Sequence, residues 1–450
     1  MKSKLFIFLA VGGVCLMSCS DKASYKFKEG QPDYSSKAST NVFRIGAWVS
    51  PPPGNWNGKG NANFITQESY NVVAESGINV IYCLYEHNNK TATINALDYA
   101  EEAGIKYLAR DANVSLDPIA MELEEGEVRE LTSSYNSKKA LRGWLVQDEP
   151  SATQFEALGR SKEYFSKEFP NKEFYVNLFP TYANTSQLGV ASYEEYIDRF
   201  IQIVKPDFLS FDHYTMMQDG YGHKKLSEDV LWNLDLVAKK CKAAGIPMYT
   251  FVQAMSFDET TRVPNEQEIR HQVLTQLAYG SRSIQYFCYW TPLEFDKGSP
   301  AMITIDGQKT DIFNYVKTVN SELMNIDEVF YEYSWDATMP IIGSDVHTLV
   351  KQYELLDDKV TSFEAINSYT ATQNTLISRF IGKDGREAFM VMNFSDPALN
   401  ATDHVTIEFG GGKKALYYHK TEKKVVELKK HVLELDIEPG DGYFVIPFEG

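Results

Sequence analysis

One pattern recurs between residues 41 and 320: an amphipathic helical stretch, then a glycine, then a short run rich in apolar and β-branched residues. Gly77, Gly104 and Gly245 each stand at such a point. Glycine allows the left-handed turn that ends a helix, so a strand can follow at once. Helices that alternate with strands at this spacing indicate parallel strands joined by right-handed crossovers. The pattern therefore predicts an α/β fold.

The number of repeats decides between two kinds of α/β fold. Residues 50–54, after the first expected strand, read Ser-Pro-Pro-Pro-Gly and not a Gly-rich phosphate loop, which argues against an open doubly wound sheet. Eight strands over about 280 residues match a closed (β/α)8 TIM barrel, which we expect over residues 41–330. The eight strands are expected at Phe43–Val49, Asn79–Tyr85, Lys106–Ala109, Leu141–Gln147, Glu173–Leu178, Phe208–Phe211, Met248–Val252 and Ser283–Tyr289.

The sequence pattern changes at residue 335. From there on, runs of alternating apolar and polar residues are separated by Gly- and Pro-containing turns, without helices between them. Such hairpin signals predict a small C-terminal all-β sandwich over residues 335–450. We expect this domain to support the barrel and not to bind ligand. Its strands are expected at Thr375–Ile381, Ala388–Asn393, Val405–Phe409, Ala415–His419 and Tyr443–Phe448.

The N-terminus resembles that of a bacterial lipoprotein. Two lysines precede an apolar run over residues 5–17, which is too short for a membrane span and suits a signal peptide over residues 1–18. Residues 16–19 read Leu-Met-Ser-Cys and resemble a lipobox, which implies lipidation of Cys19. Residues 19–40 are expected to form a flexible tether. A lipid anchor at Cys19 would place the protein in the cell envelope, on a face that the sequence leaves undecided; an ordinary signal peptide with an incidental cysteine is the alternative.

Charge and cysteine content narrow the partners. The formal net charge of −17 argues against nucleic acid and against anionic lipid surfaces, so the anchor is the only membrane contact expected. Cys83, Cys241 and Cys288 are odd in number, lack metal-site spacing and are expected to be buried. Neither a dinucleotide fingerprint nor a His-Glu-x-x-His motif occurs, so no cofactor and no metal are expected.

The fourth expected strand carries the strongest functional signal. It ends in Asp148-Glu149-Pro150, and barrel enzymes place their active sites at the carboxyl ends of the strands. Two adjacent carboxylates there repel each other and lose solvation, which a purely structural site seldom accepts. The alternative is that Glu149 caps the next helix. We interpret the pair as catalytic.

This segment resembles the strand-four motif of the clan A glycoside hydrolases, in which a Glu before Pro is the acid/base. With the lipobox, it is similar to glycan-degrading lipoproteins of Bacteroidetes-type bacteria. The resemblance implies a carbohydrate substrate and a Glu149 that protonates the leaving oxygen, with a raised pKa. Two departures stand out: Asp148 replaces the usual Asn, and Gln253 occupies the place of the strand-seven Glu nucleophile.

An amide cannot form the glycosyl ester, which leaves three possibilities. Asp212, at the end of the sixth strand, supplies the second carboxylate as base or nucleophile. Alternatively, Asp148 and Glu149 act as the adjacent pair of substrate-assisted hexosaminidases, where the substrate's 2-acetamido group attacks. In the third possibility the barrel binds glycan without cleaving it. Asp258 and Glu259 reach the site only if their loop folds inward.

Other residues at strand ends are expected to contact the sugar. Trp48 and Trp290 end the first and eighth strands, neighbours in a closed barrel, and their rings suit stacking on sugars, although each equally suits a core. The remaining candidates are polar side chains that suit hydrogen bonds to hydroxyls: Glu86, Asp111, Asn177, Tyr182, Tyr214 and Gln253.

Overall fold

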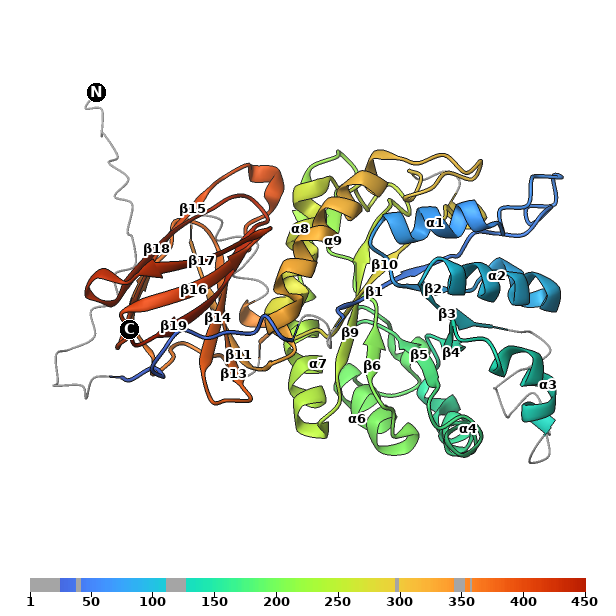
Figure 1. The fold of residues 1–450 in the computed structure, drawn as a ribbon, viewed down its shortest axis with the longest axis horizontal. Helices are drawn as coiled ribbons and strands as arrows, with labels where there is room; N and C mark the ends of the chain where they lie inside the picture. Colours follow the sequence, from blue (N-terminus) through green and yellow to red (C-terminus); the bar gives the residue numbers. More distant parts are fainter. Residues whose placement is uncertain (1–24, 38–41, 111–126, 296–298, 344–352, 357) are drawn as a thin grey trace, which may run out of the picture.

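A computed structural model describes residues 25–37, 42–110, 127–295, 299–343, 353–356 and 358–450 (Figure 1). Eight parallel strands close into a barrel, because the last strand pairs with the first, with Arg44 opposite Ser283. The predicted barrel and all eight strand positions are confirmed. The strands are β1 (Arg44–Trp48), β2 (Val80–Tyr82), β3 (Lys106–Ala109), β4 (Leu141–Asp148), β5 (Glu173–Leu178), β6 (Leu209–Phe211), β9 (Met248–Gln253) and β10 (Ser283–Phe287).

Helices surround the barrel, and the three glycines of the repeated pattern have positive φ angles of 82°, 74° and 68° for Gly77, Gly104 and Gly245. Each ends a helix as expected. None of the described helices combines the length and hydropathy that a membrane span requires. The main helices are α1 (Gln67–Glu75), α2 (Lys90–Glu102), α3 (Glu127–Asn136), α4 (Phe155–Glu168), α6 (Tyr193–Val204), α7 (Val230–Ala244), α8 (Glu266–Ala278) and α9 (Asp311–Phe330).

The C-terminal domain is the expected sandwich of antiparallel sheets, one of six strands and one of three. The five predicted strands are present, and four further strands, β11, β12, β17 and β18, were not expected. The six-stranded sheet has the order β11 (Tyr333–Ile341), β13 (Thr375–Gly382), β14 (Glu387–Asn393), β19 (Gly442–Phe448), β16 (Lys414–His419) and β17 (Glu422–Glu427); the other has the order β12 (Ile366–Thr370), β15 (Asp403–Phe409) and β18 (Val432–Ile437).

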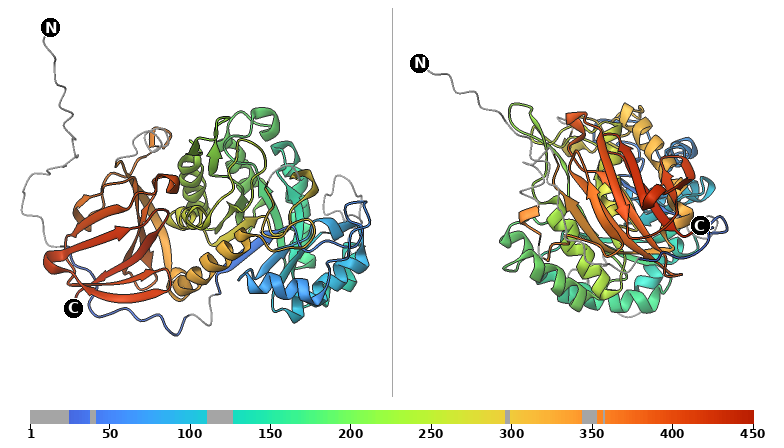
Figure 2. Two further views of the ribbon diagram at one scale, coloured as in Figure 1. Left: turned by 90° about the horizontal axis from the view of Figure 1, so that it is seen from above. Right: turned by 90° about the vertical axis from the view of Figure 1, so that its left-hand side faces the viewer.

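The central strands of the six-stranded sheet are buried on both faces. Ile377, Val391 and Val445 point into the sandwich core, whereas their neighbours in sequence belong to the barrel's core cluster. This division follows from the two-residue period of a strand. Figures 1 and 2 show α8 and α9 between the barrel strands and this sheet. The second face therefore packs against the barrel helices.

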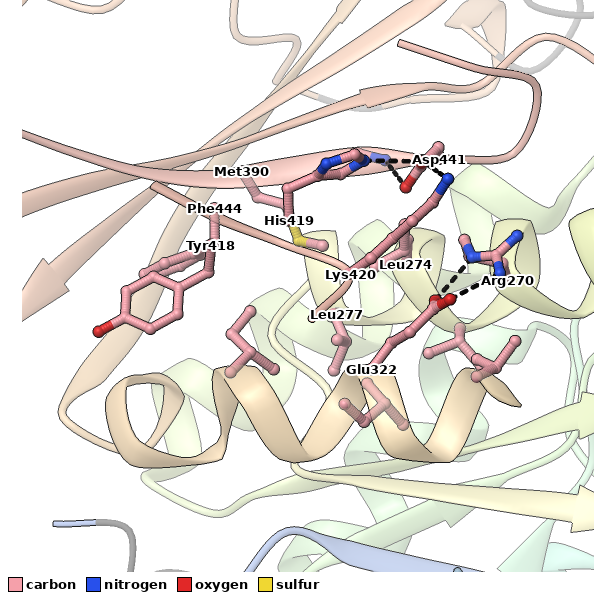
Figure 3. Close-up of a pocket in the computed structure, with 15 residues that line it drawn as sticks. Arg270, Leu274, Leu277, Glu322, Met390, Tyr418, His419, Lys420, Asp441 and Phe444 are labelled. Atoms are coloured by element: carbon pink, nitrogen blue, oxygen red, sulfur yellow. Dashed lines mark hydrogen bonds and ion pairs between the residues drawn. The ribbon is translucent and has the colours of Figure 1, made fainter. Parts of the chain in front are cut away.

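Ion pairs line each side of the interface between the two domains. Arg270 pairs with Glu322 across α8 and α9, and Asp441 pairs with His419 and Lys420 of the sandwich (Figure 3). A gap of about 40 Å³ lies among them, too small for a sugar ring. These contacts are structural, in keeping with the supporting role expected of the domain.

The N-terminal segment corrects one expectation. Residues 25–37, predicted to be tether, pack on the C-terminal domain: Phe27 is buried in the sandwich core, and the hydroxyl of Tyr34 lies 2.8 Å from that of Tyr333. Backbone hydrogen bonds join Gly30 and Lys28 to Glu449. Three aromatic residues, Tyr25, Phe27 and Tyr34, anchor a segment whose other residues are mostly polar. Cys19 lies outside the described residues.

Candidate active site

A pocket of about 320 Å³ opens at the carboxyl ends of the barrel strands. It holds the three predicted catalytic carboxyl groups, Asp148, Glu149 and Asp212, and no residue that lines it is cationic. Three predicted contact residues also line it, and four phenylalanines complete the wall: Trp48, Asn177, Tyr214, Phe251, Phe257, Phe287 and Phe295.

Glu149 is held by a strained backbone directly after β4. Its φ angle is 46°, and its N–H donates to the carbonyl of Asn177 at 2.8 Å. Val49, after β1, has a φ of 67°. A left-handed conformation costs a residue other than glycine about 1–2 kcal/mol, and such strain gathers at functional sites. The strain at Glu149 accompanies its position in the pocket wall.

The carboxyl groups raise one another's pKa. Burial, followed by the charges of Asp212 and Asp148, raises the pKa of Glu149 to about 8. Burial and the charge of Asp148 raise the pKa of Asp212 to about 7. Asp148 is exposed to the pocket yet surrounded by protein, and this desolvation raises its pKa against a hydrogen bond from Asn177. Glu149 therefore retains a proton at neutral pH, as a general acid must.

Asn177 fixes the two aspartates. Its Nδ2 donates to Asp212 Oδ1 at 2.8 Å and to Asp148 Oδ1 at 3.2 Å. The hydroxyl of Ser210 donates to Asn177 Oδ1 at 3.0 Å, which orients the amide. Asn177 was predicted to bind sugar hydroxyls. In the structure its amide nitrogen donates to the two aspartates, so this side chain holds Asp148 and Asp212 in place.

A chain of buried hydrogen bonds continues from Ser210 to the opposite end of the barrel. Gln285 Nε2 donates to Ser210 Oγ at 3.0 Å, and Gln285 Oε1 accepts from Tyr175 at 2.8 Å and from Tyr82 at 2.5 Å. Arg44 Nη2 donates to the Tyr82 hydroxyl at 2.9 Å. The barrel interior is thus polar along one path from Arg44 to the pocket.

The phenylalanines of the pocket were not singled out by the sequence. The ring centroid of Phe257 lies 4.6 Å from that of Tyr214, 5.6 Å from Phe287 and 5.5 Å from Phe295. Phe287 ends β10, and its position at a strand end was the available signal. Phe257 lies in a loop and Phe295 in a short 3-10 helix (Leu293–Phe295), where nothing in the sequence distinguishes them from core residues. Together the phenylalanines form the apolar part of the pocket wall.

Gln253 does not line the pocket, which corrects its predicted role in binding substrate. Its side chain is completely buried; Nε2 donates to the carbonyls of Met255 and Arg262, and Oε1 accepts from the Met216 N–H at 3.2 Å. The amide therefore supports the loops after β6 and β9. A charged Glu would fit these backbone partners poorly.

Glu86 and Trp290 are also placed away from the pocket. Glu86 is fully buried and accepts hydrogen bonds from Ser50 and Tyr107. Trp290 is buried, with its ring centroid 4.6 Å from that of Phe64. Its backbone does adjoin β1, as expected from a closed barrel, but of the two tryptophans only Trp48 reaches the pocket.

The other candidates lie at the rim or outside the described residues. Tyr182 is 56% exposed and contacts the ring of His213, but it does not line the pocket. Asp258 and Glu259 are exposed and also lie outside it. Asp111 falls outside the described residues. The three cysteines from the described chain, Cys83, Cys241 and Cys288, are buried as expected.

His213 does not pair with Asp212. Its two ring nitrogens contact Asn233 and Ser227 at 2.8 and 2.9 Å, and Asp229 lies 3.3 Å away. Asp212 therefore has no ion pair with His213. No three His, Cys, Asp or Glu side chains of the described chain are grouped so as to hold a metal ion.

Solved structures with a similar fold include two glycosidases. A catalytic mutant of a GH42 beta-galactosidase from G. stearothermophilus is similar with a TM-score of 0.54 at 9% identity, over 91% of this chain and 100% of that chain. An Anoxybacillus alpha-amylase gives a TM-score of 0.51 at 9% identity, over 91% and 98%. No protein-family model and no curated protein sequence matches the chain. The similarity is one of fold.

Proposed function

We propose that the protein is a glycoside hydrolase in which Glu149 is the general acid and Asp212 the second carboxylate. The observation that carries the proposal is the raised pKa of Glu149 beside a second carboxyl group, in an aromatic pocket at the carboxyl end of the barrel. The fold shared with a beta-galactosidase and an alpha-amylase supports it.

The chemistry follows from the charges in the pocket. Protonated Glu149 donates to the leaving glycosidic oxygen while positive charge develops at the anomeric carbon. Asp212 faces that charge once it has lost its own proton, and Asn177 holds its carboxylate in place. Asp212 acts either on a water, with inversion, or directly as nucleophile, with retention.

A second route uses the same pocket. Asp148 is exposed to it, and its Oδ1 accepts from Asn177. This carboxylate is available to orient a 2-acetamido group that attacks the anomeric carbon, with Glu149 as the acid. The two routes differ in which aspartate is required and in whether the substrate needs the acetamido group.

The pocket favours uncharged glycans. Its two aspartates repel uronic acids and sulfated sugars when they are ionised, and none of the residues that line the pocket is cationic. Phenylalanine and tryptophan rings suit the apolar faces of sugar rings.

The test is hydrolysis by the full chain, wild type against Glu149→Gln, on 2-acetamido sugars paired with matched plain hexosides and pentosides. Removing a general acid lowers the rate by about 10²–10⁴-fold. Glu156→Gln, at an exposed position on α4, is the matched control and should retain activity. Cleavage restricted to 2-acetamido substrates, lost in Asp148→Asn, selects the substrate-assisted route; loss in Asp212→Asn on plain sugars selects Asp212.

One outcome would falsify the hydrolase: wild type and Glu149→Gln bind a glycan equally well and both leave it intact. The barrel would then be a glycan-binding protein, the third possibility that the sequence raises.

We also propose the cell envelope as its location, through a lipid on Cys19. Tyr25 is the first described residue, and the chain from Cys19 to Tyr25 spans at most about 20 Å. Because residues 25–37 pack on the sandwich, that domain would lie nearest the membrane. Labelled palmitate should be incorporated into the wild type and not into Cys19→Ser. Equal labelling of both proteins, or of neither, would contradict a lipid anchor at Cys19.

A further inference from the structure

A second, larger cavity of about 690 Å³ lies at the amino ends of the barrel strands, opposite the candidate active site. Arg44, Lys106, Arg142 and Arg282 line it, together with the rings of Tyr249 and Tyr331. No carboxylate is among the residues that line it. In a chain with a net charge of −17, four cations around one cavity are an unusual local excess of positive charge.

The cations are only partly neutralised. Glu173 pairs with Arg44 and, at 2.6 Å, with Arg142. Within the described chain, Lys106 and Arg282 have no ion pair: Lys106 donates to the carbonyl of Lys139 at 2.9 Å, and Arg282 donates to those of Phe330 and Tyr333. One carboxylate therefore serves four positive side chains.

Burial of part of this positive charge is costly, because buried charges lose their solvation. Arg44 is 6% exposed, and its Nε has no hydrogen-bond partner. Its guanidinium carbon lies 4.8 Å from the centroid of the Tyr249 ring, which holds it in place. Arg282 is also largely surrounded by protein, and this desolvation lowers its pKa. Buried cations normally have an anionic partner; Arg44 shares Glu173 with Arg142, and Arg282 has only carbonyl partners among the described residues, so the excess of positive charge points to an anionic ligand.

We propose that this cavity binds a small oxyanion, such as a phosphate, a sulfate or the carboxylate of a sugar acid. Arg142 and Lys106 would make the direct contacts, because both keep exposed surface at the cavity while Arg44 and Arg282 are fixed by protein groups. Guanidinium and ammonium groups are the usual partners of such oxygens. The site is distinct from the pocket of Glu149, where the charge has the opposite sign, and it does not depend on the proposed hydrolase activity.

The test is isothermal titration of the full chain with inorganic phosphate, sulfate and free glucuronate, at constant ionic strength set with chloride. We compare wild type with Lys106→Gln/Arg142→Gln and with the control Lys59→Gln/Lys429→Gln, which removes the same charge from exposed positions elsewhere. At least one anion should bind wild type and control alike and bind the cavity variant at least tenfold more weakly. Preference for phosphate and sulfate, or for glucuronate, identifies the source of the oxyanion.

Thermal unfolding of each variant without anion shows whether it is folded. If the double variant is not folded, the single variant Arg142→Gln replaces it, because the side chain of Arg142 is half-exposed. The proposal fails if none of the three anions binds the wild type, or if a folded cavity variant binds as tightly as the control.

Discussion

The two ends of the barrel have opposite electrostatic character. At the carboxyl ends of the strands, Asp148, Glu149 and Asp212 line a pocket without a cation; at the amino ends, arginines and Lys106 line a cavity without a carboxylate. The same closed sheet supports both. A few side chains therefore determine whether each end of the barrel is acidic or basic. For this reason the chemistry of the protein has to be inferred from the site and not from the barrel fold.

The pKa values of Glu149 and Glu173, one at each end of the barrel, illustrate this electrostatic difference. Burial raises the pKa of Glu149, and its acidic neighbours raise it further. Burial acts in the same direction on Glu173, but the guanidinium groups of Arg44 and Arg142 outweigh it and lower the pKa of Glu173. A carboxyl group without a cation keeps its proton and is ready to donate it, whereas a paired one contributes to stability.

The largest effect is expected from breaking the pair at the amino end. Arg44→Met takes from Glu173 one of its two cationic partners and leaves it with the half-exposed Arg142, so it should destabilise the fold by about 3 kcal/mol, the lower end of the cost of breaking a buried ion pair. Urea unfolding followed by circular dichroism measures it. The double variant Arg44→Met/Glu173→Gln should recover much of the loss. If the double variant is as unstable as the single one, the packing of Arg44 and not its charge is what matters.

Breaking the connection between the two ends should have a smaller effect. Gln285→Met removes the partner of Tyr82, Tyr175 and Ser210 in the barrel interior. Leaving buried polar groups unpaired costs about 1–3 kcal/mol, measured again by urea unfolding. Because Ser210 orients Asn177, kcat should also fall while KM stays unchanged. Gln308→Met, at an exposed position, is the control. A normal kcat in Gln285→Met would mean that the hydrogen bonds of Gln285 are not needed to orient Asn177.

The pH dependence of kcat/KM tests the carboxyl end. The alkaline limb should follow Glu149, with a pKa of about 8, because the acid must keep its proton; the acid limb should follow Asp212, with a pKa of about 7. Asp148→Asn removes a negative charge that raises both values. Both limbs should therefore move to lower pH, by about one unit. Both limbs should keep their pH in the control Asp306→Asn, which changes an exposed residue. If they also keep their pH in Asp148→Asn, the charge of Asp148 does not raise the pKa values of Glu149 and Asp212.

Much of the fold could be predicted because it depends on local patterns. Gly77, Gly104 and Gly245 end helices through their backbone freedom, and the apolar runs after them can only be strands. The edge strand β17 was missed because its lysines indicate a solvated surface, which is also how exposed edges are protected. The packing of Phe27 and Tyr34 was missed for a different reason: two separate aromatic residues have no periodicity, and their partners are more than 290 positions away.

The candidate site divides in the same way. Asp148 ends β4, and Glu149 and Asp212 follow directly after β4 and β6, so the closed barrel brings the three together without further information. Gln253 ends β9 and Glu86 lies in a short 3-10 helix (Tyr85–Asn88) after β2, yet both turn to partners within the protein. Position along a strand gives the end of the barrel at which a residue lies, and tertiary packing decides whether its side chain reaches the pocket.

The smallest effect is expected from the loop after β9, where an acid would have to replace the missing strand-seven nucleophile. Asp258 Oδ1 accepts from the hydroxyl of Thr260 at 2.7 Å and from its N–H at 2.8 Å, and these bonds lower the pKa of Asp258. Asp258→Asn keeps an acceptor in the same place, so kcat/KM should change by less than about twofold, as for surface substitutions in general. Assays beside Asp212→Asn decide the matter, because a comparable loss in both would mean that the loop turns inward when substrate binds. The assignment of Asp212 as the second carboxylate would then have to be shared with Asp258.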